Sequence, residues 1–264
     1  MGEFIAHYEQ VPEGSRLEQG WGRLELARTQ ELILRHLPKP PGMVLDVGGA
    51  AGVYSAWLGT LGYETHLIDP VPRHVEGARK LAAHIKSASV GDARKLARAD
   101  GSFDAVLLFG PLYHLTDRAE RLTALGEAYR VLRARGLLYA AAINHFASLL
   151  DGLVRGFIDD PRFVAILEQD LASGQHRNPT NNPNYFTTAF FHRPEELSAE
   201  IAEAGFSMIE LAGVEGPAWL APDFDARWTD PARREQLLAL VRRVEHEAVL
   251  LGVSMHLLAV ARKG

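Results

Sequence analysis

The sequence predicts an α/β protein with a doubly wound, mostly parallel sheet. Short apolar segments alternate with longer segments in which apolar residues recur at helical spacing. A glycine-rich turn, Gly48 to Gly52, separates the first apolar segment from the next helix. Short apolar strands separated by helices indicate a parallel sheet covered on both faces, and right-handed crossovers make such a sheet doubly wound.

The expected elements follow this alternation along the chain. A first helix is predicted over residues 15–37, and a proline-rich cluster at 38–42 ends it. Strands are then expected at residues 43–47, 65–68, 87–90, 104–109 and 137–143. Helices between them are expected at residues 53–61, 71–84 and 118–132. In the remaining chain, helices are expected at 146–157, at 162–172, from Pro194 and at 231–250. A polar loop is expected at 174–185, and strands are expected at 207–211 and 254–261.

Composition narrows the class of protein. The chain has 264 residues, 47% of them hydrophobic, and a formal net charge of −5, which argues against general nucleic-acid binding. It contains no cysteine, so disulfides, thiolate zinc sites and cysteine nucleophiles are excluded. No apolar run is long enough for a signal peptide or a membrane span, so we expect a cytoplasmic protein without a membrane partner. His246 and His256 do not have the H-E-x-x-H spacing, so no metal site is expected.

The turn after the first strand carries the main chemical signal. Its residues are Asp46-Val47-Gly48-Gly49-Ala50-Ala51-Gly52-Val53. A dinucleotide fingerprint, G-x-G-x-x-G, would need glycine at Val53, which is a poor match. The pattern D-x-G-x-(G/A)-x-G fits instead, with Asp46, Gly48, Ala50 and Gly52. A carboxylate beside the turn suits a cationic ligand and is badly placed for a phosphate.

This pattern resembles the first motif of class I S-adenosylmethionine-dependent methyltransferases. Further matches follow in the same order over about residues 43–143, including the sequence at 131–138, which is similar to the "VLRPGG" turn. The resemblance implies a seven-stranded sheet of the Rossmann-like methyltransferase fold, with an antiparallel last strand. It also implies S-adenosyl-L-methionine as the cofactor.

The resemblance implies roles for particular residues. Asp69, at the end of the second strand, would accept both ribose hydroxyls, with Pro70 beside the adenine, although Asp69 is also a plausible helix cap. The Gly91-Asp92-Ala93 segment would contact adenine, with Asp92 accepting a bond from its amino group or serving only as a cap. The backbone of Phe109 and Gly110 would contact the methionine part. The remaining expected cofactor-binding residues are Gly49 in the turn and, in the amino-terminal segment, Tyr8 and Arg16.

Three residues are candidates for catalysis. Tyr113 and His114 follow the fourth strand, where the resemblance places the transferred methyl group, and His145 follows the fifth strand at the same rim. A histidine titrates near neutral pH and can deprotonate a nucleophile. Each of these histidines can equally be a packing or capping residue.

Four segments are expected. They are an amino-terminal helical lid segment at 1–37, a cofactor-binding half of the sheet domain at 38–143, an inserted helical lid lobe at 144–193, and the rest of the sheet domain at 194–264. The lobe's Asn, His, Tyr and Phe content indicates an aromatic or polar substrate of modest size. A homodimer is possible through the sheet edges or the 231–250 helix.

The expected activity is methyl transfer from S-adenosylmethionine to a small-molecule acceptor by in-line displacement. A macromolecular methyltransferase is the nearest alternative, although no N/D-P-P-Y/F motif follows the fourth strand, where Gly110-Pro111-Leu112-Tyr113 stands. A nicotinamide-dependent oxidoreductase and a non-catalytic cofactor-binding protein remain further alternatives, because fold does not fix function.

Overall fold

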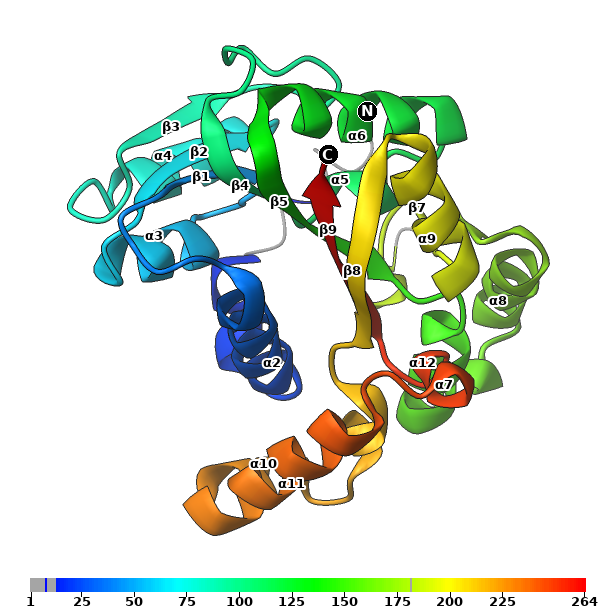
Figure 1. The fold of residues 1–264 in the computed structure, drawn as a ribbon. Coiled ribbons are helices and arrows are strands. Elements are labelled where there is room, and N and C mark those ends of the chain that lie inside the picture. Colours follow the sequence, from blue (N-terminus) through cyan, green and yellow to red (C-terminus); the bar gives the residue numbers. More distant parts are fainter. Residues whose placement is uncertain (1–7, 9–12, 181) are drawn as a thin grey trace.

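A single mixed sheet forms the centre of the protein (Figure 1). The computed structural model describes residue 8 and residues 13–180 and 182–264, so most of the segment before residue 13 lies outside the described residues. The strands are β1 (Met43–Val47), β2 (Glu64–Asp69), β3 (Ser87–Val90), β4 (Phe103–Leu108), β5 (Leu132–Ile143), β8 (Phe206–Gly213) and β9 (His256–Lys263). Their order across the sheet is β3-β2-β1-β4-β5-β9-β8. β9 is antiparallel to both neighbours and the other pairs are parallel, which confirms the predicted seven-stranded, doubly wound sheet.

Helices cover both faces of this sheet (Figure 1). On one face lie α2 (Gly22–His36), α3 (Val53–Thr60) and α4 (Pro72–Arg79). On the other face lie α6 (Arg118–Val131) and α9 (Pro194–Glu203). Side chains of β4 alternate between the faces: Leu107 packs in the core under α2 and α3, and Val106 and Leu108 pack in the core under α6 and α9. Both faces of the strand are therefore buried, as its continuous apolar run predicts.

Two predicted helices are broken in the structure. The helix expected at 15–37 consists of a 3₁₀ helix, η1 (Glu13–Glu18), and α2, and Gly20 between them has φ +48°. A Cβ on Gly22 would lie 2.1 Å from the carbonyl oxygen of Arg16, so the two segments pack too closely for any other residue. The helix expected at 231–250 consists of α11 (Pro231–Val244) and α12 (Ala248–Leu251). The spacing of apolar residues alone cannot predict breaks of this kind in a helix.

The lobe between β5 and α9 closes on itself at its base. It contains α7 (Ala147–Arg155), η2 (Phe157–Asp159), α8 (Pro161–Ser173), β6 (Gln175–His176), η3 (Pro183–Tyr185) and β7 (Ala189–Phe190). Its two ends are joined near their tips, because the His145 N–H donates to the His192 carbonyl at 2.9 Å. The chain therefore leaves and re-enters the sheet domain at one place, beside the carboxyl end of β5.

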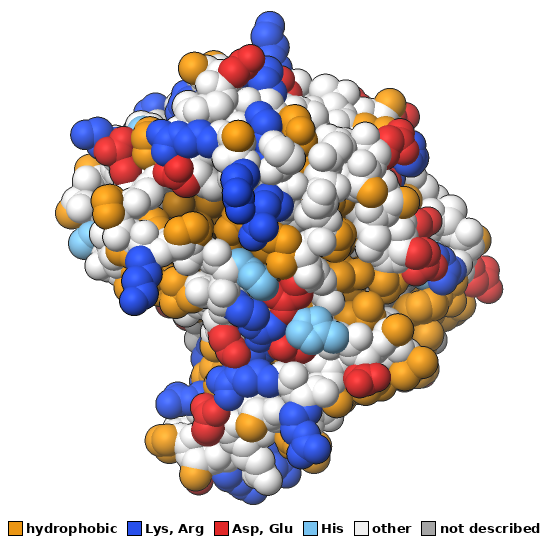
Figure 2. Space-filling view, viewed as in Figure 1, with side chains coloured by type: hydrophobic (Ala, Val, Ile, Leu, Met, Phe, Trp, Pro, Cys, Tyr) orange, Lys and Arg blue, Asp and Glu red, His pale blue; other side chains and the backbone are white. Residues whose placement is uncertain are grey.

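A second excursion separates β8 from β9. It contains η4 (Gly216–Leu220), α10 (Phe224–Thr229), α11 and α12, and in Figure 1 α10 and α11 project from the sheet. Trp219, Phe224 and Trp228 pack there with Leu24 of α2, so the excursion has its own apolar core. Basic and acidic side chains are interspersed over the face in Figure 2. Within the described part of the chain, no helix is long and apolar enough to cross a bilayer.

Candidate active site

The glycine-rich turn follows β1 and leads into α3. Gly48, Ala50 and Gly52 have φ values of +76°, +47° and +89°, so three left-handed residues reverse the chain within five positions. Gly49 is required for a different reason, because a Cβ there would lie 2.6 Å from the Asp46 carboxyl group. The turn therefore holds the backbone against a carboxylate at the carboxyl end of β1.

Asp46 is a buried acid with one unsatisfied oxygen. Its Oδ2 accepts a hydrogen bond from Ser55 Oγ at 2.7 Å, and its Oδ1 has no partner among the described residues. Burial, with a contribution from the nearby Asp69, raises the pKa of Asp46 to about 7. A buried carboxylate in this state gains from a cationic ligand and repels a phosphate, which is the chemistry expected from the turn.

Asp69 ends β2 and braces the turn. Its Oδ2 accepts from the Ala50 N–H at 2.9 Å, and its Oδ1 accepts from the Val71 N–H at 2.9 Å and lies 3.1 Å from His74 Nδ1. A carboxylate oxygen can accept more than one hydrogen bond, so both oxygens keep capacity for a ligand diol. His74 was not predicted from the sequence; its Nε2 is buried without a partner among the described residues, at the edge of the same cavity.

A first cavity collects nearly all the predicted cofactor-binding residues at the carboxyl edge of the sheet. Those that line it are Tyr8, Arg16, Asp46, Gly48, Gly49, Ala50, Asp69, Pro70, Gly91, Asp92, Ala93, Phe109 and Gly110. Gly52 does not line it and acts through the turn, as the residue before α3. Asp92 accepts from the Arg94 backbone at 2.9 Å and pairs with the Arg94 guanidinium at 2.6 Å, but residues 94–97 form no helix, so the helix cap considered for Asp92 is wrong.

A second cavity of about 990 Å³ lies beside the first. Tyr8, Arg16, Glu25, Tyr113 and His256 line both cavities, so these residues mark where the two meet. Aromatic residues of the excursion, the lobe and the start of α2 line the far wall together with charged residues such as Asp151, Arg155 and Asp225; the aromatic ones are Trp21, Phe163, Tyr185, Phe186, Phe191 and Phe224. The volume of the second cavity lies in the range of small-molecule sites.

The three catalytic candidates fall in different places. Tyr113, in α5 (Pro111–His114), lines both cavities, and His114 lines the first. The Tyr8 hydroxyl lies 3.1 Å from His114 Nε2, and the two rings pack edge to face. His145 lines neither cavity: its Nε2 lies 3.2 Å from the Leu171 carbonyl and 3.0 Å from an Arg193 nitrogen. The structure therefore brings Tyr113 and His114 to the site but not His145.

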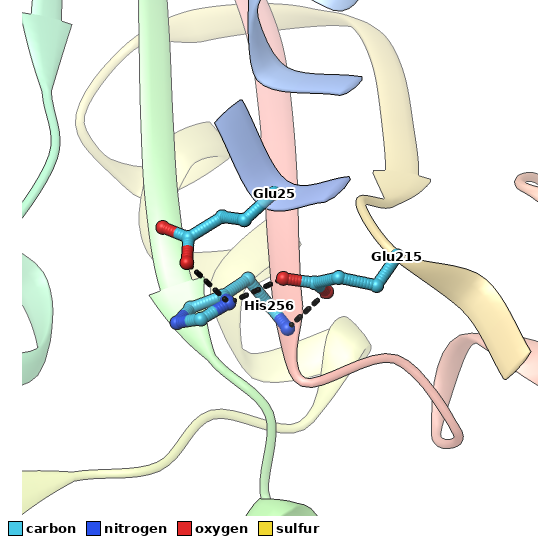
Figure 3. A group of neighbouring side chains, drawn as sticks. All are labelled: Glu25, Glu215 and His256. Carbon is cyan, nitrogen blue, oxygen red and sulfur yellow. Dashed lines mark hydrogen bonds and ion pairs between the residues drawn. The ribbon is translucent and has the colours of Figure 1, made fainter. Parts of the chain in front are cut away.

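A further cluster, Glu25–His256–Glu215, lies at the junction of the cavities (Figure 3). His256 Nδ1 is 2.6 Å from Glu215 Oε1 and 3.8 Å from Glu25 Oε2. Glu215 Oε2 also accepts from Ser254 Oγ at 2.8 Å and from the His256 N–H at 3.0 Å. These hydrogen bonds fix the orientation of the imidazole ring relative to the sheet.

The sequence did offer one signal for this cluster. β9 is antiparallel to β5, so its first residue, His256, pairs with Ile143, the last residue of β5. The amino end of an antiparallel last strand therefore lies at the same edge as the carboxyl ends of the parallel strands. From the sequence, His256 was considered only as a possible metal ligand, and its place at this edge was therefore missed.

Charge couples the members of the cluster. Burial acts against ionisation of Glu25, but Arg16 and His256 lower the pKa of Glu25 to about 2. Burial likewise opposes protonation of His256, but Glu25 and Glu215 raise the pKa of His256 to about 9. The three ligand-type atoms lie within 4.8 Å of one another, a spacing that could also hold a cation.

The fold and the first cavity define a doubly wound α/β protein whose cavity presents two buried carboxylates, Asp46 and Asp69, at the carboxyl edge of the sheet. Residues 45–140 match the family model described as a methyltransferase domain. The chain is 28% identical over 205 residues to a ubiquinone biosynthesis O-methyltransferase from Azorhizobium caulinodans, covering 72% of each chain. It is 29% identical over 214 residues to the enzyme of the same name from Methylocella silvestris, covering 76% of this chain and 75% of that one.

A solved structure shows the same fold. An S-adenosylmethionine-dependent methyltransferase from Mesorhizobium loti matches with a TM-score of 0.60 and 17% identity, over 90% of this chain and 99% of that one. In sequence the chain is therefore similar to O-methyltransferases, and in fold to S-adenosylmethionine-dependent methyltransferases.

Proposed function

We propose that this enzyme binds S-adenosylmethionine in the first cavity and methylates a hydroxyl oxygen of an aromatic small molecule in the second. The observation that carries the proposal is the unpartnered, buried Oδ1 of Asp46 on a cavity that also presents Asp69. A buried anion and a diol-binding carboxylate on one cavity fit the charge and the ribose of this cofactor. The named O-methyltransferase relatives support oxygen as the methylated atom.

The chain's residues divide the work of binding. Asp46 would stabilise the cationic methionine end, and Asp69 would accept the ribose hydroxyls. The Gly91–Ala93 segment would flank the adenine, and the backbone at Phe109 and Gly110 would flank the methionine part. When bound, S-adenosylmethionine supplies a methyl group on a positively charged sulfur, which is a good leaving group.

Residues at the junction of the cavities would align the reactants and exclude water. The Tyr8 ring packs edge to face against both His74 and His114, and all three residues line the first cavity. We infer that Tyr8 and Arg16 close the methionine end and that Tyr113 orients the acceptor. His114 remains a candidate base, and its contact with the Tyr8 hydroxyl also suits a role in holding Tyr8 closed.

The lobe at 144–193 acts as a lid in this proposal, together with the amino-terminal segment. It contributes Phe163, Tyr185, Phe186 and Phe191 to the second cavity, and these rings suit a flat, aromatic acceptor. A small-molecule acceptor is favoured over a macromolecule because the aromatic rings line a recess of about 990 Å³ and the similar O-methyltransferases act in ubiquinone biosynthesis. Homodimer formation and a cytoplasmic location stay predictions from the sequence.

Calorimetry with S-adenosylmethionine and with NAD tests the cofactor. We expect micromolar binding of S-adenosylmethionine and none of NAD. Asp69→Ala should weaken binding by about 100-fold, because it removes a charged acceptor of two hydrogen bonds. Asp69→Asn should weaken it less, and Asp100→Ala, at an exposed acid outside both cavities, should not change it. Binding of NAD instead, or equal affinity in all variants, would contradict the proposal.

A further inference from the structure

We propose that His256 is the proton acceptor for the acceptor's hydroxyl group, oriented by Glu215 and supported by Glu25, so that the preferred acceptors are phenols. The inference rests on the proposed function. It adds a catalytic residue that lies outside the glycine-rich motif and that no motif of the family resemblance assigns.

The orientation of the His256 ring leaves one of its nitrogens able to accept a proton. His256 Nδ1 faces Glu215 at 2.6 Å, and Figure 3 shows the other ring nitrogen on the side of the ring away from Glu215. With Nδ1 carrying the hydrogen that Glu215 accepts, Nε2 is the nitrogen with a free lone pair. His256 lines both cavities, so this nitrogen serves the place where acceptor and methyl donor meet. A base held by a third group in this way has the arrangement of a catalytic dyad.

The buried Glu215 carboxylate holds the His256 ring in this orientation. Glu215 is 2% exposed and accepts hydrogen bonds from Ser254, from the His256 backbone and from the imidazole, so it cannot rotate without losing all three. Its carboxylate stabilises the imidazolium that forms when His256 takes a proton. Glu25 adds a second negative charge at 3.8 Å, itself held by Arg16. Proton transfer from a neutral hydroxyl to His256 is thereby made more favourable.

The reaction balances on these groups. The acceptor's O–H proton moves to Nε2, and the oxygen's electron pair forms the new bond to the methyl carbon. The bond from that carbon to sulfur breaks with its pair left on sulfur, which becomes neutral. His256 then returns its proton to solvent. A phenol suits this base, because phenols ionise near pH 10 and the imidazolium is stabilised by two carboxylates.

The expected pH profile follows from the groups around the ring. Arg16 of η1, Glu25 of α2 and Glu215 after β8 face it, with Tyr54 of α3 and Tyr113 of α5 lining the same cavity. The neutral imidazole is the active form, so kcat should rise with pH, reach half of its maximum near pH 9, where the pKa of His256 lies, and level off above that pH. Glu215→Gln should move this midpoint downward, because it removes the charge nearest the ring.

The first test compares His256→Gln with wild type and with His84→Gln, an exposed histidine outside both cavities. With a simple phenol, we expect His256→Gln to lower kcat by about 100-fold or more, to abolish the rise with pH and to leave S-adenosylmethionine binding unchanged. His84→Gln should behave as wild type. The loss should shrink for an acidic phenol such as 4-nitrophenol, which needs no base.

The second test does not depend on turnover. 4-Nitrophenol is titrated into the complex with S-adenosylhomocysteine, and its ionisation is followed by absorbance. Wild type should bind the phenolate at a pH where free 4-nitrophenol is neutral, and His256→Gln should bind the neutral form. Equal absorbance in both proteins, or an unchanged pH profile of kcat in His256→Gln, would overturn the inference while leaving the proposed function intact.

A metal role is the remaining outcome. Loss of activity with a chelator, restored by Mg²⁺ or Mn²⁺ and absent from His256→Gln, would make the cluster a cation site and overturn proton transfer to His256. Failure of wild type to bind S-adenosylmethionine at all would instead contradict the proposed function.

Discussion

Asp46→Asn separates the contribution of the buried acid to cofactor binding from its effect on folding. The substitution removes the charge but keeps the shape, and the asparagine oxygen can still accept the hydrogen bond from Ser55 Oγ. We expect the variant to be more stable than wild type at high pH and to bind S-adenosylmethionine more weakly. The same unpartnered oxygen explains both effects.

The magnitude follows from the pKa of Asp46. Burial raises it from 3.8 to about 7, so the folded protein holds this proton at pH values where the unfolded chain has released it. The free energy of unfolding of the wild type therefore falls as pH rises from about 4 to 7. The upward shift of the pKa sets this loss at about 4 kcal/mol at most. The variant has no such loss. Its free energy of unfolding relative to wild type should increase by up to about 4 kcal/mol over this window.

Thermal unfolding without cofactor, at pH 5 and pH 8, checks the stability effect. The variant should gain roughly 5–10 °C over wild type between the two pH values. Calorimetry at pH 8 should show affinity for S-adenosylmethionine reduced by about tenfold or more, because a charged partner is lost. Asp100→Asn, at an exposed acid, should show neither effect. A stability difference that does not vary with pH, or unchanged affinity, would refute the reasoning.

Three further substitutions test the packing around the site. Gly49→Ala should lower stability by about 1–3 kcal/mol and weaken cofactor binding, because its Cβ would lie 2.6 Å from the Asp46 carboxyl group; calorimetry and thermal melts measure both. Gly126→Ala, in α6 with nothing within 4 Å of a new Cβ, should raise stability by about 0.5–1 kcal/mol and leave binding unchanged. Arg28→Met should cost about 3 kcal/mol in urea unfolding, because Arg28 is fully buried and pairs with the buried Glu245; the exposed Arg233→Met should have little effect.

The cofactor half of the site could be predicted from the sequence because its signals are local. The turn from Asp46 to Gly52 needs left-handed residues at fixed positions, and glycine marks two of them. Asp69 and Asp92 follow apolar runs that alternation identifies as strands. Each of these residues lies at a strand end, and parallel strands bring their carboxyl ends to one edge. Local pattern and topology were therefore sufficient to bring these residues to one cavity, and their binding roles stay predictions.

The acceptor half could not be predicted in the same way, because its residues come from distant segments. Glu25 lies on α2, Glu215 follows β8, and His256 begins β9. No spacing rule connects these positions, and each is unremarkable in its own stretch of sequence. His145 shows the converse error: it follows β5 directly, but its ring turns into the lobe, where Arg193 and the Leu171 carbonyl contact it.

The direction of the last strand explains why Glu215 and His256 lie at the same edge of the sheet as the glycine-rich turn. β9 runs antiparallel between β5 and β8, so its amino end, and not its carboxyl end, lies at the ligand edge. β8 runs parallel to β5 and delivers Glu215 to the same edge just after Gly213. The pair can meet only because the chain turns back between the two strands through the α10–α12 excursion. A parallel last strand would place His256 at the opposite edge, away from both cavities and from the carboxylate that orients it.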